Sequence, residues 1–155
     1  MEYQKARLDY QFKKISALRE GVYPTFGGNI EFELFSFFEV CYHLKDWVQE
    51  STGDETVESF VNETPALRIA ADICNRLKHK NLRKRKNGEI VTHKRSKAPL
   101  GPFEISLVTT IGPTSQMASV SIRKALIRTE RGEECCFELA NECMEEWENY
   151  LRSHT

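Results

Sequence analysis

The sequence predicts an α+β protein: a bundle of four helices with a three-stranded antiparallel β insertion before the last helix. Three observations predict it. Apolar residues recur at helical spacing in the first half of the chain and again after Gly132. Between these parts, residues 88–129 are rich in Val, Ile and Thr and contain Gly-Pro turns. With 155 residues, the chain is expected to form one domain, 1–155.

The first two helices are expected over residues 2–20 and 30–50. In the first, apolar residues spaced three or four apart share one face, and Gly21 and Pro24 end the helix. In the second, apolar residues cover most of the circumference. This pattern predicts a central helix packed on several sides, with Trp47 buried in the core.

The third long helix is expected over residues 65–82. Thr64 is a candidate N-cap, and Pro65 follows it at the first helical position, which proline favours. A short helical turn over residues 57–61 is one option for the chain before it.

Three strands are expected over residues 89–95, 103–111 and 120–128. The connections between them are too short for parallel crossovers, so the pairing should be antiparallel. After Arg131-Gly132 the helical period returns, which predicts a closing helix over 133–152 with Trp147 on its buried face.

Composition favours a water-soluble protein of the cytoplasm. Hydrophobic residues are 40% of the chain, charged residues 29%, and the formal net charge is −1. The most apolar stretch, 32–48, contains too many charges to span a bilayer, and the first residues lack the apolar run of a signal peptide. An odd number of cysteines argues against a secreted disulfide framework, so we expect reduced thiols and assign the adjacent pair Cys135-Cys136 a structural role.

Positive charge is concentrated between residues 76 and 97. This segment holds ten of the 22 basic residues and one acid, so its formal charge is +9 and the rest of the chain carries −10. Three interpretations stay open: contacts to an RNA or DNA backbone, a solvated surface, or a homodimer in which this segment meets the acidic closing helix of another copy. The candidate nucleic-acid-binding residues are Arg76, Lys78, Lys80, Arg83, Lys84, Arg85, Lys86, Lys94, Arg95 and Lys97.

Polar residues also follow one side of each of two predicted helices. On the second helix they are Ser36, Glu39, His43, Asp46 and Glu50. On the third they are Arg68, Asp72, Asn75 and His79. If the two lines met, they would form an acid/base or nucleotide pocket, or a metal site; otherwise each is a solvent-facing helix edge. The candidate catalytic residues are His43, Asp46, Asp72, Asn75 and His79.

The stretch 71–79, Ala-Asp-Ile-Cys-Asn-Arg-Leu-Lys-His, resembles the motif helix of the HEPN superfamily. Catalytic members carry an Arg, a polar residue that is often Asn, a few residues and then a His. Asn75 and His79 match the second and third of these, whereas Cys74 occupies the Arg position and Arg76 lies out of register. The stretch 38–47 is also similar to segments of small bacterial and phage proteins of this type.

The resemblance implies a small helical bundle, often dimeric, that binds or acts on RNA or nucleotides. Under this hypothesis His79 is the acid/base group, Asn75 positions the phosphate or ribose, and Lys78 or Arg76 replaces the missing Arg. Whether the protein is an enzyme stays open, and no cofactor is expected. The alternative is a non-enzymatic interaction or self-associating domain that uses its basic hairpin, and the third hypothesis is a metal-binding bundle. No membrane partner is expected.

Overall fold

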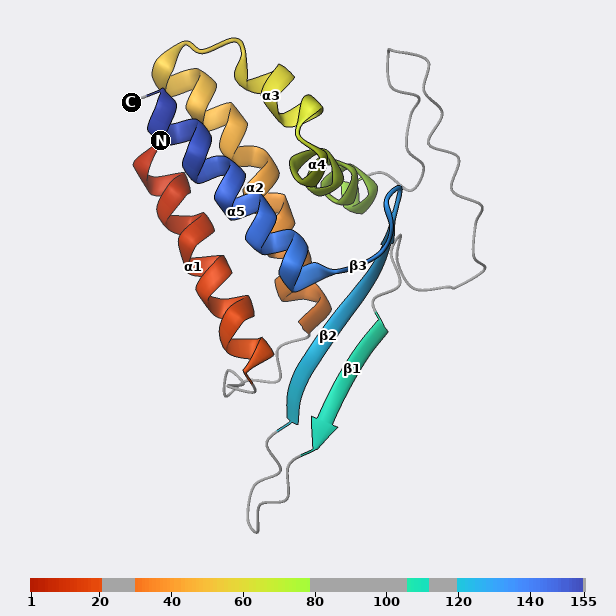
Figure 1. Ribbon diagram of the computed structural model, residues 1–155. Coiled ribbons are helices and arrows are strands. Elements are labelled where there is room, and N and C mark those ends of the chain that lie inside the picture. Colours follow the sequence, from red (N-terminus) through yellow and green to blue (C-terminus); the bar gives the residue numbers. More distant parts are fainter. Residues whose placement is uncertain (21–29, 79–105, 112–119, 155) are drawn as a thin grey trace.

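The computed structural model describes residues 1–20, 30–78, 106–111 and 120–154; the side chains of 76–78, 106–111 and 120–124 are not described. The chain is α+β, mostly helical with a small antiparallel sheet (Figure 1). In chain order the elements are α1 (Glu2–Arg19), α2 (Ile30–Thr52), α3 (Val57–Glu63), α4 (Pro65–Lys78), β1 (Ser106–Ile111), β2 (Val120–Thr129), β3 (Gly132–Cys135) and α5 (Cys136–Ser153).

Helix α2 is the central helix, as its apolar circumference predicts. It contacts α1, α3, α4 and α5. The side chains of Phe37, Phe38 and Leu44 are fully buried along it, and Trp147 of α5 packs into the same core. Figure 1 shows α1, α2 and α5 running side by side, with both chain ends at the same end of these helices. The burial of Trp147 is confirmed.

The predicted burial of Trp47 is wrong. Its side chain is 39% exposed and its ring lies 6.2 Å from the ring of Tyr3, which is also exposed. Position 47 falls on the part of α2 that faces solvent beside α1, whereas Val48, the next residue, is buried. The neighbouring helices, rather than the apolar pattern, decide which side of α2 stays open.

The sheet has the order β1-β2-β3, and both strand pairs are antiparallel. Residue Leu126 of β2 pairs with Ser106 on one side and with Cys135 on the other. Ala125 and Ile127 of β2 are buried, and both α1 and α5 contact this strand. In Figure 1 the β1–β2 ladder extends past the ends of the helices.

The three-stranded insertion is not confirmed in the form that the sequence predicts. The expected strands over 103–111 and 120–128 correspond to β1 and β2. The expected strand over 89–95 lies outside the described residues, as do residues 79–82 of the third predicted helix. The third strand of the observed sheet is β3, which the sequence analysis assigns to the closing helix.

The closing helix begins at Cys136, so the predicted start at residue 133 is wrong. Residues 132–135 pair with β2 before the helix begins. Gly132 adopts a positive φ of 117°, which glycine tolerates, and this lets the chain turn tightly back from β2. The Thr129 hydroxyl accepts a hydrogen bond from the Arg131 amide and donates to the Glu134 carboxylate. These contacts stabilise extended backbone at Glu133 and Glu134, two residues that by themselves favour a helix.

Candidate functional site

A group of polar side chains lies where α2 packs against α3 and α4. His43 and Asp46 are three residues apart on α2, so they share a face, and His43 Nδ1 lies 3.0 Å from Asp46 Oδ2. The other ring nitrogen, Nε2, lies 3.7 Å from Cys74 Sγ on α4. The His43 side chain is 42% exposed, whereas Cys74 is 5% exposed. The contacts therefore run from the surface into the α2–α4 interface.

The Asp46 carboxylate is held by two donors, one on each oxygen. Oδ2 faces His43, and Oδ1 accepts a hydrogen bond from Lys45 Nζ at 3.0 Å. Partial burial raises the pKa of Asp46, but the hydrogen bonds from His43 and Lys45 outweigh it and lower the pKa below its ordinary value. Asp46 is therefore an ionised acceptor at neutral pH, which favours a proton on His43 Nδ1.

Lys45 is a buried lysine that links α2 to α3. Its ammonium group also contacts Glu58 Oε2 at 2.5 Å and lies 5.0 Å from the centre of the Tyr42 ring. Burial alone lowers the pKa of Lys45, but the hydrogen bonds to Glu58 and Asp46 reverse the effect and raise it. Lys45 is thus a fixed positive charge that orients the Asp46 carboxylate.

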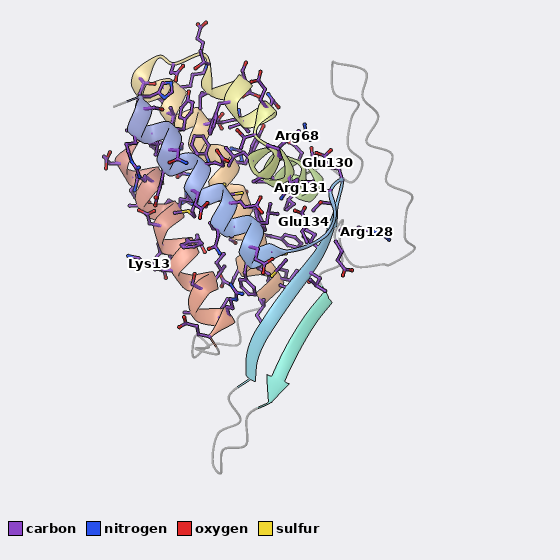
Figure 2. All side chains as sticks on the ribbon, in the orientation of Figure 1. Lys13, Arg68, Arg128, Glu130, Arg131 and Glu134 are labelled. Carbon is purple, nitrogen blue, oxygen red and sulfur yellow. The ribbon has the colours of Figure 1, made fainter. Side chains whose placement is uncertain are left out.

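The polar line predicted for the third helix divides between two directions. Asp72 and Asn75 are half-buried on α4. Arg68 turns instead toward the sheet, where its Nε donates to Glu130 Oε1 at 2.8 Å (Figure 2). His79 lies outside the described residues. The structure brings His43 and Asp46 together. That the polar residues of the second and third predicted helices meet along their whole length stays a prediction.

The predicted nucleic-acid-binding residues are only partly described. Arg76 and Lys78 belong to the last turns of α4, and their side chains are not described. The other eight lie outside the described residues. Their contribution to binding stays a prediction based on charge.

Cys74, which occupies the Arg position of the resemblance, faces His43 from α4. A buried thiol does not supply the positive charge that the Arg would place at a phosphate. Asn75, the matching polar residue, is half-buried on the next position of the helix.

Two residues of this group, Lys45 and Glu58, and the contact between Cys74 and His43 were not predicted from the sequence. Lys45 left a detectable signal, because it falls beside Leu44 on a helix whose other inward positions are apolar. A charged residue on a buried face needs an ionic partner. The identity of that partner, Glu58, depends on how α3 folds back on α2.

Within the described ranges, no group of three or more His, Cys, Asp or Glu side chains is arranged to hold a metal ion. In the same part of the chain, no helix has both the length and the apolar character needed to cross a membrane. Comparison with protein-family models, curated proteins and solved structures finds no match to this chain.

Proposed function

We propose that this chain is a HEPN-like protein that binds RNA or a nucleotide-like ligand through its phosphates. The observation that carries the proposal is the +9 segment over residues 76–97, in a chain whose net charge is −1. Clustered lysines and arginines neutralise phosphates and release counterions, which drives binding without sequence preference. The segment begins within α4, the helix that also carries Asn75.

The arrangement of α2 and α4 supports a ligand site at the start of this segment. His43 and Asp46 present a half-exposed imidazole–carboxylate pair beside Cys74, immediately before Asn75 in α4. Asn75 is proposed to position a phosphate or ribose, with Lys78 or Arg76 supplying charge. His79 is proposed as the acid/base group if the bound RNA is cleaved. Binding is the primary proposal, because Cys74 cannot replace the electrostatic role of an Arg.

The test compares the salt dependence of RNA binding in two variants of equal charge change. The first replaces Arg83, Lys84, Arg85 and Lys86 by Gln. The second replaces four exposed basic residues elsewhere by Gln: Arg7, Lys13, Arg128 and Arg152. A single-stranded RNA oligonucleotide is titrated by fluorescence anisotropy from low to high salt.

The first variant should weaken binding and reduce the slope of log K against log salt by up to about 3, at roughly 0.7 per phosphate contact. The second should change the slope little, although its net charge is identical. Equal slopes in the two variants would show that binding reflects overall charge, and unchanged affinity in the first variant would refute the proposal.

Self-association is the second candidate function, and the exposed acidic face of α5 favours it. Four glutamates project from this face: Glu138, Glu142, Glu145 and Glu148. They complement the basic segment in charge, so one copy could bind another. Light scattering of the same proteins at low and high salt measures their mass in solution. Under this second hypothesis the unmodified protein is a dimer at low salt, and the variant without Arg83, Lys84, Arg85 and Lys86 is a monomer.

A further inference from the structure

Asp46, His43 and Cys74 form a continuous line of contacts across the α2–α4 interface. The carboxylate faces one nitrogen of the imidazole ring at 3.0 Å, and the sulfur faces the other at 3.7 Å. The two α2 residues are less than one helical turn apart, while the thiol comes from a helix 31 residues further along the chain. Packing, rather than sequence proximity, assembles this group.

The order carboxylate, imidazole, thiol has a definite chemical consequence. An ionised Asp46 accepts the Nδ1 proton of His43, which leaves the Nε2 lone pair directed at the Cys74 thiol. A base in that position can take the thiol proton, and the thiolate is the reactive form of cysteine. This is the nucleophile–base–orienting-group arrangement that enzymes on unrelated folds share.

The charges around the group favour this assignment. Lys45 fixes the second oxygen of Asp46 and is itself held by Glu58 of α3. The Tyr42 ring lies 5.3 Å from the His43 ring, and burial raises the pKa of its hydroxyl, so Tyr42 is neutral. Among these charged and polar groups, His43 is the one whose ring nitrogen lies within hydrogen-bond distance of the Cys74 sulfur.

The other four cysteines provide an internal comparison. All are buried thiols. The Cys143 thiol donates to the backbone carbonyl of Ala66 at 3.5 Å, whereas Cys74 faces the His43 ring. Burial raises the pKa of Cys136 to about 12 and that of Cys143 well above its ordinary value. Cys135 is 6% exposed, close to the 5% of Cys74, so burial alone does not distinguish these two residues.

We propose that Cys74 is a nucleophilic thiol, with His43 as its base and Asp46 as a positioning residue, and that it reacts with hydroperoxides. Cys74 is 5% exposed as a residue and lies beside a half-exposed imidazole, so the proposal is confined to a small electrophile. A peroxide needs access for only two oxygen atoms.

The reaction needs no reagent other than the peroxide. His43 Nε2 takes the thiol proton, and the thiolate attacks one peroxide oxygen. An S–O bond forms as the O–O bond breaks, and His43 returns its proton to the departing oxygen. Two electrons pass from sulfur to the peroxide, giving a Cys74 sulfenic acid and water or an alcohol.

The experiment measures the reactivity of each cysteine in the folded, full-length chain. Hydrogen peroxide is added, the sulfenic acid is trapped with dimedone, and mass spectrometry quantifies each cysteine peptide. Iodoacetamide alkylation across pH 5–9 reports thiolate formation in parallel. The variants are His43→Asn, Asp46→Asn and a control on the exposed face of α2, Gln49→Ala.

In the unmodified protein and in Gln49→Ala, Cys74 should react at least ten-fold faster than Cys135 at pH 7, since base assistance is typically worth about 100-fold or more. His43→Asn should reduce the Cys74 rate to that of Cys135. Asp46→Asn should shift the pH midpoint of Cys74 alkylation upward, a change that simple loosening of the fold does not produce because loosening would accelerate all five cysteines. Equal rates at Cys74 and Cys135, or a Cys74 rate that survives His43→Asn, would overturn the proposal.

Discussion

Trp147 anchors α5 in the core, and replacing it should destabilise the protein strongly. Its side chain is 1% exposed, and Nε1 donates a hydrogen bond to the backbone carbonyl of Cys41 at 3.1 Å. Its ring also packs edge-on against Phe60 and Tyr150, with centroids 5.6 and 6.0 Å away. Each of these contacts joins α5 to a different part of the bundle or to its own last turn.

The magnitude follows from these contacts. Trp147→Ala removes a whole buried ring and should cost about 3–5 kcal/mol. Trp147→Phe keeps most of the packing but loses the hydrogen bond and the smaller ring of the indole, so we expect a cost of about 2 kcal/mol. For an m value of about 2 kcal/mol/M, these losses lower the urea midpoint by about 2 M and about 1 M.

Urea unfolding followed by circular dichroism measures both variants, and Trp47→Phe is the matched control. Trp47 is 39% exposed, so its replacement should change the free energy of unfolding by about 0.5 kcal/mol or less. Acrylamide should quench the fluorescence that remains in Trp147→Phe, which comes from Trp47, more strongly than the fluorescence that remains in Trp47→Phe. Equal costs for the two Phe variants, or equal quenching, would refute the placement of α5 in the core.

Two further predictions concern stability. Hydrogen bonds from Thr56 and Tyr150 lower the pKa of Asp54 to about 2, so its contribution to stability should be complete above about pH 4 and disappear as the pH falls toward 2. The urea midpoint of Asp54→Asn should accordingly be lower than that of the unmodified protein at pH 6 and converge with it in acid; parallel pH profiles would contradict this. The ion pair between Arg68 and Glu130, which joins α4 to the β2–β3 turn, should show a coupling energy of about 0.5–1 kcal/mol in a double-mutant cycle at low salt. That coupling should shrink at 1 M salt, and a value independent of salt would indicate that packing rather than charge connects the two side chains.

The candidate site was only partly predictable from the sequence. The spacing of His43 and Asp46 placed them on one face of a helix, and the structure joins them by a hydrogen bond. Their contact with Cys74 could not be derived, because it depends on the rotation of α4 about its own axis where it packs on α2. The same uncertainty applied to Lys45, whose partner Glu58 comes from a separate short helix.

The sequence by itself predicted where four helices and the strands β1 and β2 lie along the chain, although not where α5 begins, because apolar spacing and turn residues are local signals. It also determined the uneven charge of the chain, which no fold alters. Tertiary structure decided the rest. Residues 132–135 form β3 because β2 is available to pair with them, although their glutamates favour a helix. Trp47 is exposed because an apolar pattern around most of a helix cannot say which side its neighbours leave open. Within the part of the chain that the structure describes, the packing of α2 against α4 brings Cys74 to His43, since contacts between distant residues are fixed by how the elements meet.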